Sequence, residues 1–452
     1  MIIAKFGGTS VGDAEAIRRL LRIVTDRRPE QPVVVLSALA GVTDQLLRLA
    51  TLTAHGDGDA VRDGVHALAT RHRDVADSLG LDEATLAPVL EEIAQVGMAL
   101  AERSGRTSTP EELDWLAGHG EQWSSAMVVA AGSAARLPVV LVDVRSVMRT
   151  DTRFTRARPD RTALAEEAPR VFGPLLDRGL VPVTQGFLGR TPDDRPTTLG
   201  RGGSDFTATL LGAALGATRV EIWTDVDGLM TADPRIVPHA RCLTVATYEE
   251  AAELATFGAK VLHPATQLPL AEAGIPIHIL NSRRPEGPGT RIVASVDIDL
   301  ASGPIRSISW KRGITVITVQ APRMLGAYGF LRRLFEIFER HEVVVDVLAS
   351  SEVSVSLTIE EETALGTLRP ELEALGRVDV ATGRAIVAVV GIGLRVTPGI
   401  AARIFGAISD TNVEVISQGS SAINVTFVVR EEEARSVVRR LHDEFIGAEG
   451  ED

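Results

Sequence analysis

The sequence predicts an α/β protein in which a mainly parallel sheet is sandwiched by helices and is followed by two ferredoxin-like α+β units. Short, continuously apolar stretches recur up to about residue 280, and several lead through a turn into a helix, which is typical of strands buried on both faces of a sheet. From about residue 305 the pattern changes to β-branched strands around fewer helices. The 452 residues also exceed the size at which one hydrophobic core stops growing, so several domains are expected.

The opening residues set the pattern of the predicted sheet. Residues 2–6 form an apolar strand, and a glycine turn leads into a helix near residues 13–27. Residues 32–37 repeat the arrangement before a second helix that opens at Thr43. Further strands are predicted at residues 139–142, 180–184, 220–223 and 277–280.

One segment interrupts this alternation of strands and helices. Residues 56–105 are rich in Ala, Leu and Glu at helical spacing and contain no strand candidate, so a helical insertion is predicted there. Prolines and glycines within residues 281–289 end this part of the chain. The first domain is therefore expected over residues 1–295.

The remainder contains a weak internal repeat of roughly 70 to 75 residues. Each copy reads strand, helix, strand, strand and then a further helix, the order expected of a ferredoxin-like unit. The predicted units span residues 305–383 and 384–452, and one larger α+β domain is the alternative. The predicted strands are residues 313–319, 343–348, 353–359, 385–390, 413–417 and 423–429, and the helices that follow each first strand are residues 330–340 and 399–408.

Charge and cysteine content exclude several classes of partner. Lysine and arginine total 47 against 60 acidic residues, a net charge of −13, so neither nucleic acid nor an anionic membrane is an expected partner. The single cysteine, Cys242, cannot form an internal disulfide, and no Cys/His group has zinc-ligand spacing. No signal peptide or apolar run of membrane-spanning length is found, so a cytoplasmic protein is expected.

A glycine-rich stretch, residues 197–209, is the most informative motif. Three glycines within four positions allow the backbone to pass close to a ligand, directly before a helix that opens with Ser204 and Asp205. Backbone N–H groups at such a helix N-terminus bind phosphate or carboxylate oxygens, and Arg201 adds a cation. The alternative is that the loop merely turns the chain.

Known nucleotide motifs do not explain this loop. The sequence has no Walker motif, G-x-x-x-x-G-K-S/T, and no G-x-G-x-x-G opening a βαβ unit. Instead, Lys5 stands at the carboxyl end of the first strand, directly before Gly7 and Gly8. A lysine beside backbone donors at that edge of a sheet suits a phosphoryl group in transfer.

Two later loops carry further polar residues. Thr224, Asp225 and Asp227 follow the strand at 220–223 and precede a glycine, although an ordinary Asp-Gly turn is the alternative. A second loop supplies Lys260, whereas His263 precedes a proline and is interpreted as structural.

Taken together, these segments resemble aspartate kinases, over nearly the whole chain. Residues 324–331 are most similar to the monofunctional, lysine-sensitive type, and no homoserine dehydrogenase is expected after residue 447. The resemblance implies an amino-acid kinase fold with paired C-terminal ACT regulatory domains. It is carried by Lys5-Phe6-Gly7-Gly8-Thr9-Ser10, Gly120-Glu121, Phe154-Thr155, residues 197–205, Thr224-Asp225-Val226-Asp227-Gly228, Asp233-Pro234-Arg235 and Phe257-Gly258-Ala259-Lys260.

The resemblance implies phosphorylation of the side-chain carboxylate of L-aspartate by ATP, giving 4-phospho-L-aspartate, the first step of aspartate-family amino-acid biosynthesis. The attacking carboxylate is ionised at neutral pH and needs no general base. The enzyme must instead bring two anions together, which requires cations and N–H donors around the γ-phosphate and Mg²⁺ across the β and γ oxygens.

The resemblance also assigns residues to these tasks, without a protein ligand for the metal. Lys5 and Asp205 would be catalytic, Asp205 by orienting Lys5 and by helping to bind the substrate amine. The residues expected to hold aspartate are Ser37, Thr43, Glu121, Arg201, Gly203 and Ser204, with Arg201 on the α-carboxylate. Those expected to contact ATP are Lys5, Gly7, Gly8, Thr224, Asp225, Arg235 and Lys260.

ACT-like units commonly bind free amino acids where two of them pair, so feedback inhibition by L-lysine is expected, with threonine as the competitor. Asp346 and Glu352 suit a cationic amine, although solvated charges at strand ends are the alternative. Edge strands of such units favour a homodimer or a dimer of dimers. The expected effector contacts are Met324, Gly326, Tyr328, Phe330, Leu331, Val345, Asp346, Ser351 and Glu352.

Two other functions compete with this interpretation. One is another amino-acid kinase of the same fold, acting on glutamate, N-acetylglutamate or carbamate. Glu121, the helical insertion and the ACT pair favour aspartate over these. The other is a catalytically silent amino-acid sensor, which the presence of Lys5, Asp205 and Lys260 disfavours.

Overall fold

The computed structural model describes the chain except for residues 259–261, 297–303, 322–327, 361–363 and 448–452. The chain forms two compact units. The first contains Met1–Gly228, Thr244–Tyr248 and Val261–Val296, and the second contains Leu229–Leu243, Glu249–Lys260 and Asp297–Asp452. Two segments of the expected first domain, 229–243 and 249–260, thus group with the C-terminal residues.

The first unit is built on an eight-stranded sheet in the order β3-β4-β2-β1-β7-β9-β10-β8. All neighbouring strands are parallel except β9 and β10, which are antiparallel. A separate hairpin joins β5 (Leu188–Arg190) to β6 (Pro196–Thr198). The sheet strands are β1 (Ile2–Phe6), β2 (Pro32–Leu36), β3 (Val139–Val142), β4 (Val181–Gln185), β7 (Val220–Thr224), β8 (Val245–Thr247), β9 (Ile277–Asn281) and β10 (Thr290–Val293).

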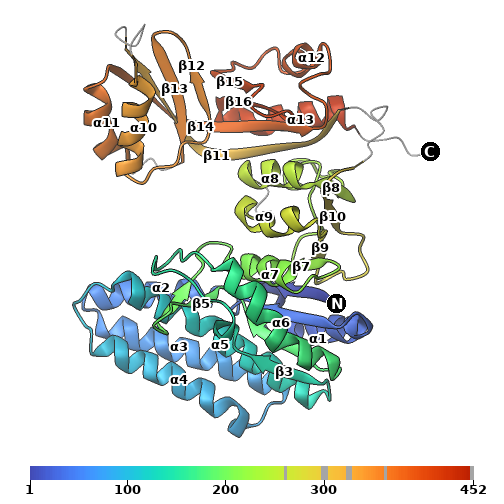
Figure 1. Cartoon of the computed structure of the whole chain (residues 1–452). Coiled ribbons are helices and arrows are strands. Elements are labelled where there is room, and N and C mark those ends of the chain that lie inside the picture. The colour runs from blue at the N-terminus through green and yellow to red at the C-terminus, as the bar shows by residue number, and fades with distance from the viewer. Residues whose placement is uncertain (259–261, 297–303, 322–327, 361–363, 448–452) are drawn as a thin grey trace. The chain divides into compact units, whose positions relative to one another are not determined.

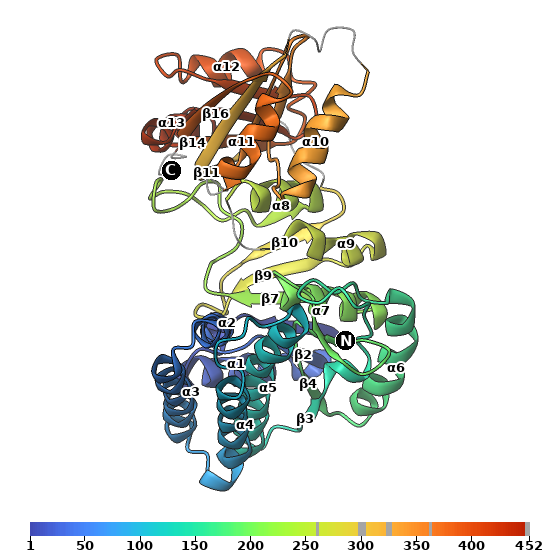
Figure 2. The same cartoon turned by 90° about the vertical axis from the view of Figure 1, so that its left-hand side faces the viewer.

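Helices cover both faces of this sheet, which confirms the predicted α/β class (Figures 1 and 2). One face contacts α1 and α5, and α2, α3 and α4 extend that layer, whereas α6 and α7 pack on the other face. The central strands are buried along their whole length because both faces are covered. The helices are α1 (Ala14–Arg27), α2 (Val42–Ala54), α3 (Gly58–Leu79), α4 (Glu83–Ala101), α5 (Pro110–Ala134), α6 (Arg161–Asp177), α7 (Gly203–Ala214) and α9 (Pro264–Ala273).

Side chains at the helix N-termini explain where several of these helices begin. Asp13 accepts a hydrogen bond from the backbone N–H of Ala16 at 2.7 Å and so caps α1. Thr109 and Glu112 form a capping box at the start of α5, with a proline at its first position. His263 caps α9 through Nδ1, which confirms its structural interpretation.

The antiparallel pair α3 and α4 lies within residues 56–105. Among the described helices, α4 is long and apolar enough to cross a membrane, with a mean hydropathy of 1.2, although the sequence predicted no such run. It nevertheless places Leu86, Val89, Ile93 and Leu100 in the main hydrophobic core, together with residues of α3 and α5. Their three- and four-residue spacing is that of one buried helix face in a globular protein.

The second unit contains a six-stranded antiparallel sheet in the order β12-β13-β11-β14-β16-β15. The predicted order of strand, helix, strand, strand and helix occurs twice. The strand predicted at 343–348 begins only at Leu348. The elements of the second unit are β11 (Ile305–Gln320), α10 (Phe330–Arg340), β12 (Leu348–Ser350), β13 (Ser354–Ile359), α11 (Leu365–Glu373), β14 (Arg377–Gly391), α12 (Ile400–Gly406), β15 (Val415–Gln418), β16 (Asn424–Arg430) and α13 (Glu431–Phe445). Helix α8 (Tyr248–Thr256) also lies mostly in this unit.

Two hydrophobic clusters share the two long strands of this sheet. Ile317 on β11 and Val378 on β14 belong to the cluster beneath α10 and α11. Ile308 and Val387, on the same strands, belong to the cluster beneath α12 and α13. The boundary expected between residues 383 and 384 therefore falls inside β14, and the first repeat is inserted into the second.

The ladder between β11 and β14 is irregular where the clusters meet. Its register shifts between Lys311 and Ile314 and again between Ile314 and Val316. Gly313 and Gly383 adopt φ values of 71° and 66° there, which residues with a Cβ rarely adopt. A β-bulge thus separates the two halves of each long strand.

Candidate active site

Lys5 lies at the carboxyl edge of the first sheet, between two parallel neighbours. It stands opposite Val35 on β2 and Ile222 on β7, so the loops that follow all three strands leave from the same edge. Open α/β sheets bind ligands at this edge. The Lys5 side chain is only 9% exposed, so its charge requires a partner.

That partner is Asp205, in the first turn of α7. Lys5 Nζ and Asp205 Oδ1 are 2.6 Å apart, and the Asp205 side chain is 15% exposed. The resemblance implied that these two residues lie together, and the structure brings them together. The pair fixes an ammonium group beside both the glycine turn that follows β1 and the start of α7.

The N-terminus of α7 allows other groups to approach its backbone closely. Gly202 precedes it with φ of 74°, and no side chain caps the helix. The Gly203 N–H donates to the Gly200 carbonyl at 2.9 Å, so the N–H groups of Ser204 and Asp205 are the ones that a ligand could use. A Cβ at Gly203 would come within 2.5 Å of the Phe187 ring. A Cβ at Gly186 would come within 2.5 Å of the Ser204 side chain. Only glycine fits at these two positions without displacing its neighbours.

A buried carboxylate holds the glycine-rich loop in place. Asp114 of α5 accepts hydrogen bonds from the backbone N–H of Thr198 at 3.0 Å, from its hydroxyl at 2.5 Å and from the backbone N–H of Thr155 at 2.8 Å. Burial raises the pKa of Asp114, while the Thr198 hydrogen bonds oppose that rise. One side chain thus fastens two segments of the predicted site, the loop at 197–205 and Phe154-Thr155.

Among the carboxyl groups near Lys5, Glu121 has the most strongly shifted pKa. It is 4% exposed, and burial raises its pKa to about 8, against the lowering effects of the Ala38 backbone and the Lys5 charge. Its Oε2 atom is buried without a hydrogen-bond partner among the described residues. A buried acceptor left unpaired costs free energy, and a donor from a ligand would relieve that cost.

The loop after β2 is held close to Glu121. The Ser124 hydroxyl donates to the Ser37 carbonyl at 2.8 Å, and a Cβ on Gly120 would come within 2.8 Å of the Ala38 side chain. Thr43 lies in the first turn of α2 near Gly120, since its hydroxyl would be 3.6 Å from that same Cβ. Ser37, Thr43 and Glu121, all predicted to hold aspartate, thus come from adjoining segments.

The carboxyl ends of β7 and β9 form the neighbouring part of the edge. Thr224 ends β7, and its hydroxyl donates to Asp225 at 3.3 Å. The Ser10 hydroxyl donates to Ser282 Oγ at 2.8 Å, which connects the glycine turn after β1 to the residue that follows β9. Asp227 accepts a hydrogen bond from Asn281 at 2.7 Å, so its carboxylate is partly engaged within the protein.

Three predicted contacts are not paired with the other site residues in the described structure. Arg201 is exposed, and no ion pair is found for its guanidinium among the residues that the structure describes. Arg235 belongs to the second unit, where its 89% exposed side chain pairs with Asp233 at 2.8 Å. Lys260 lies outside the described residues.

The expected effector residues have contrasting environments. Phe330 is buried in the cluster beneath α10, whereas Tyr328 is 98% exposed. Met324 and Gly326 lie outside the described residues. The others are Leu331, Ser351 and Glu352, which are exposed, and Val345, which is partly buried.

Asp346 differs from the other expected effector residues because its carboxylate is already paired. Its side chain is 8% exposed, and Oδ1 is 2.9 Å from Lys311 Nζ. Burial raises the pKa of Asp346, and Lys311 partly opposes that rise. Lys311 also pairs with Glu360, and Asp346 Oδ2 has no hydrogen-bond partner within the described structure.

Sequence reasoning missed three residues that shape the catalytic edge, Asp114, Ser124 and Gly186, and it named Ser10 only as part of the motif that carries the resemblance. Asp114 and Ser124 lie inside a long helix, where polar residues are ordinarily solvated. Only the fold reveals their contacts with distant loops. Ser10 follows the strand that carries Lys5, and Gly186 follows the strand predicted at residues 180–184, so both stand beyond the carboxyl end of a predicted sheet strand, where ligands are commonly bound.

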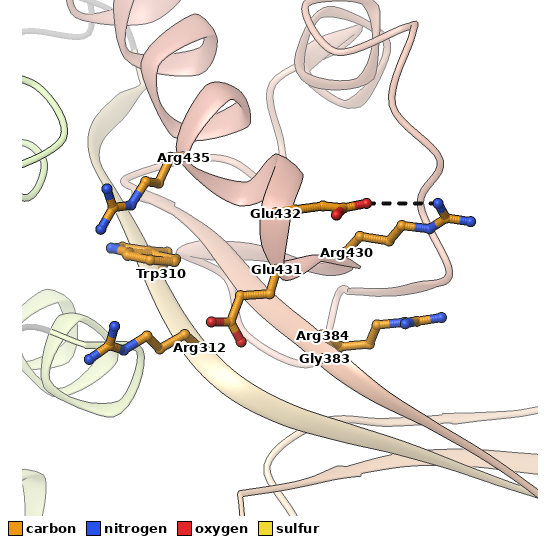
Figure 3. A pocket seen from close by; sticks show the side chains of 8 residues that line it. All are labelled: Trp310, Arg312, Gly383, Arg384, Arg430, Glu431, Glu432 and Arg435. Atoms are coloured by element: carbon orange, nitrogen blue, oxygen red, sulfur yellow. Dashed lines mark ion pairs between the residues drawn. The ribbon is translucent and has the colours of Figure 1, made fainter.

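A cavity of about 670 Å³ lies in the second unit and contains none of the predicted site residues. Figure 3 shows Arg312 and Arg435 on either side of Trp310. Its other charges are largely engaged within the chain, since Arg430 pairs with Glu432, Arg384 pairs with Glu414, and Glu431 accepts a hydrogen bond from the Gly313 N–H. The predicted catalytic residues thus lie outside this cavity.

Family models and known proteins match this chain over most of its length. The Amino acid kinase family model matches residues 1–281, and an ACT domain model matches residues 387–445. Lysine-sensitive aspartokinase 3 of Escherichia coli is 39% identical over 98% of both chains. Chloroplastic aspartokinase 1 of Arabidopsis thaliana is 35% identical over 98% of this chain and 80% of its own.

Solved structures show the same similarity in three dimensions. The chain matches E. coli aspartokinase III in complex with aspartate and ADP, the R-state, with a TM-score of 0.85, 38% identity and coverage of 99% and 100% of the two chains. It matches the complex of that enzyme with lysine and aspartate, the T-state, with a TM-score of 0.83, 38% identity and coverage of 98% and 99%.

Proposed function

The chain belongs to the aspartokinase family, and on that basis we propose that it transfers the γ-phosphate of ATP to the side-chain carboxylate of L-aspartate at the carboxyl edge of its first sheet. The observation that carries this assignment is the Lys5–Asp205 pair. It supplies a buried, positioned cation beside a glycine turn and an uncapped helix N-terminus. Two anions can meet only where such groups offset their repulsion.

The residues at this edge of the sheet fit a nucleoside triphosphate. A Cβ at Gly8 would come within 3.1 Å of the Ala38 carbonyl, so a side chain would be crowded in this turn, and a glycine here lets phosphate oxygens approach the backbone closely. Lys5, Gly7 and Gly8 would hold the γ-phosphate, with Thr224 and Asp225 toward the rest of the nucleotide. Mg²⁺, when bound with ATP, would neutralise charge on the β and γ oxygens.

Aspartate would be oriented by groups on the other side of Lys5. Glu121 offers an unpaired buried oxygen to the substrate ammonium, and Arg201 offers two parallel N–H donors to the α-carboxylate. Ser37, Thr43 and Ser204 would complete the set with hydroxyl and backbone groups. This leaves the substrate side chain facing Lys5, where its carboxylate attacks the γ-phosphorus in line.

The direct test is ADP release by the purified chain with ATP, Mg²⁺ and a panel of acidic amino acids. Turnover with aspartate, together with hydroxamate-detectable acyl phosphate, is expected, while glutamate and N-acetylglutamate should give little turnover. No turnover with any acceptor would support the silent sensor. Turnover only with another acceptor would assign a different amino-acid kinase.

L-lysine is the proposed feedback inhibitor, acting on the second unit. The name of the E. coli relative and its complex with lysine support this assignment. In this chain, Asp346 is a buried carboxylate that already accepts an ammonium group from Lys311, so the same chemistry suits the ammonium of a ligand. Isothermal titration of lysine and threonine tests the choice, and heat from neither would remove the regulatory role.

Self-association through the second sheet is proposed as well. Strands β12 and β15 end the sheet and carry the exposed apolar residues Leu348 and Ile416. An unpaired edge is commonly covered by a partner, and a second copy of the chain meets that need with closed symmetry. Light scattering after size exclusion is expected to give a dimer or a dimer of dimers, and a monomer would contradict the proposal.

A further inference from the structure

One cluster of metal-ligating side chains lies away from the catalytic edge, within the described residues of the second unit. His239, His442 and Asp443 each place one possible ligand atom within 4.8 Å of the others. His239 Nε2 is 3.3 Å from Asp443 Oδ1, and the rings of His239 and His442 are 5.1 Å apart at 72°. The three side chains come from two segments, the loop at 229–243 and the last turns of α13.

These two segments are fastened to each other by contacts that do not involve the cluster. Ile236 and Val237 of the loop belong to the same hydrophobic cluster as Val438 of α13. Arg439 donates to the Ile236 carbonyl at 2.8 Å. The scaffold that carries the three ligands is therefore already assembled, and a metal would not have to organise it.

The imidazole of His442 is the unusual member. It is completely buried, and its Nε2 lies 3.0 Å from the Thr231 hydroxyl, while Nδ1 is buried without any hydrogen-bond partner among the described residues. Buried polar atoms normally find a partner, so an unpaired ring nitrogen requires an explanation. If Nε2 donates to Thr231, the Nδ1 lone pair is free to bind a cation.

This arrangement has the composition of known metal centres. A metal-bound histidine usually donates its other N–H to a fixed acceptor, which Thr231 provides here. The Thr231 hydroxyl is itself positioned by the Arg241 N–H at 2.9 Å.

We propose that His239, His442 and Asp443 form a binding site for a divalent transition-metal ion of the zinc class, with solvent completing the coordination. Two imidazole nitrogens and one carboxylate oxygen suit zinc, cobalt or nickel, whereas magnesium prefers oxygen ligands alone. Zinc-ligand bonds of about 2.1 Å place ligand atoms about 3.4 Å apart, so the outer side chains must move inward. His239 and Asp443 are 45% and 62% exposed and have the freedom to do so.

The bound ion would clamp the loop at 229–243 onto the end of α13. It replaces the weak His239–Asp443 pair with bonds that also reach the buried ring, and thereby joins a segment early in the second unit to its last helix. The site is separate from the Lys5–Asp205 pair, so its existence does not depend on the proposed kinase reaction.

The test uses the full chain, stripped of metal with a chelator and dialysed. Titration with Co²⁺ alone is expected to produce the visible absorption of a low-symmetry site at one ion per chain, and Zn²⁺ alone should displace it and raise the melting temperature. His239→Ala and Asp443→Asn should each weaken Zn²⁺ binding by at least about tenfold while leaving the circular dichroism spectrum unchanged.

His341→Ala is the matched control. His341 also pairs with a carboxylate, Glu371, at 2.8 Å on the surface of the same unit, but no third ligand is grouped with them in the described structure. This variant should bind Zn²⁺ as the wild type does. The proposal is overturned if the wild type binds no Zn²⁺, if His239→Ala binds it unchanged, or if His341→Ala loses as much affinity as His239→Ala.

Discussion

The carboxylate of Asp114 receives both the backbone N–H and the hydroxyl of Thr198, and so fixes the first part of the glycine-rich loop from the middle of α5. The same carboxylate also receives the N–H of Thr155. A helix of the core therefore determines the position of the loop that leads to Asp205.

Asp114→Asn should destabilise the protein and lower its activity. An asparagine offers one acceptor oxygen where three hydrogen bonds are now received, so at least one buried donor is left unpaired, at a cost of roughly 1–3 kcal/mol. Thermal melting and ADP release measure the two effects. Thr198→Val alone should cost less, because it removes one donor together with its demand for a partner, and equal losses for the two variants would argue against the anchor.

Lys5→Ala should reduce the turnover number by on the order of 10²–10³, the range found when one positioned donor to a developing charge is removed. The expected magnitude follows from the burial of the ammonium group next to Asp205. The hydroxamate assay measures it. A loss of less than about tenfold, equivalent to about 1.4 kcal/mol, would mean that another group holds the phosphate.

Asp205→Asn should remove most activity with little change in melting temperature. The amide keeps the shape of the side chain but no longer compensates the Lys5 charge, so the ammonium loses its orientation. Melting curves and turnover are compared on the same preparation. A large drop in melting temperature with retained turnover would assign the carboxylate to the fold and not to catalysis.

Glu121 predicts a pH dependence for aspartate binding. With a pKa of about 8, its carboxyl group is mostly protonated at pH 7 and must lose that proton to receive the substrate ammonium. The apparent affinity for aspartate should therefore rise as pH increases from about 6 to 8 and level off above it. Glu121→Gln should bind aspartate weakly with a flat profile in this range, and an unchanged slope would assign the titration to another group.

The same carboxyl group predicts how stability changes with pH. Its pKa is raised from 4.5 to about 8 on folding, so the folded state holds a proton that the unfolded state releases. This contribution is fully present below about pH 4.5 and is lost as pH rises through about 8. Glu121→Gln should therefore melt at a higher temperature relative to the wild type at pH 8.5 than at pH 5, and the reverse order would contradict the raised pKa.

Asp346→Asn should weaken inhibition by lysine by at least about tenfold, because a charge-assisted hydrogen bond to the effector ammonium becomes a neutral one. Activity without effector should stay unchanged, since Lys311 keeps its pair with Glu360. Inhibition curves with lysine measure the change. Glu352→Gln provides a comparison at an exposed carboxylate of the same region.

Much of the fold could be predicted because the central strands are apolar throughout and the helices between them are amphipathic. The strands predicted at residues 2–6 and 277–280 are found at Ile2–Phe6 and Ile277–Asn281, and the one predicted at 139–142 is found at the edge of the sheet. The hairpin of β5 and β6 was missed because three-residue strands have no detectable periodicity. Strand β12 began later than predicted, since the apolar residues before it serve the cluster under α10 in an irregular backbone.

Site residues that follow strands or glycine turns could be predicted from the sequence, whereas those inside helices could not. Lys5 and Asp205 stand next to glycine turns, which made their segments recognisable. Asp114 sits mid-helix, and its partners at 155 and 198 are distant in sequence, so no local pattern reports the contact. The catalytic and binding roles assigned to these residues are predictions that the kinetic experiments above test. Lys260 lies outside the described residues.

The bulge at Gly313 and Gly383 lies where the two halves of the second sheet meet. Because β11 and β14 both continue through the bulge, a change of backbone conformation at these glycines would alter the angle between the two halves of the sheet. Binding of a small molecule to one half of the sheet would then change the orientation of the other half, because both halves share the strands β11 and β14.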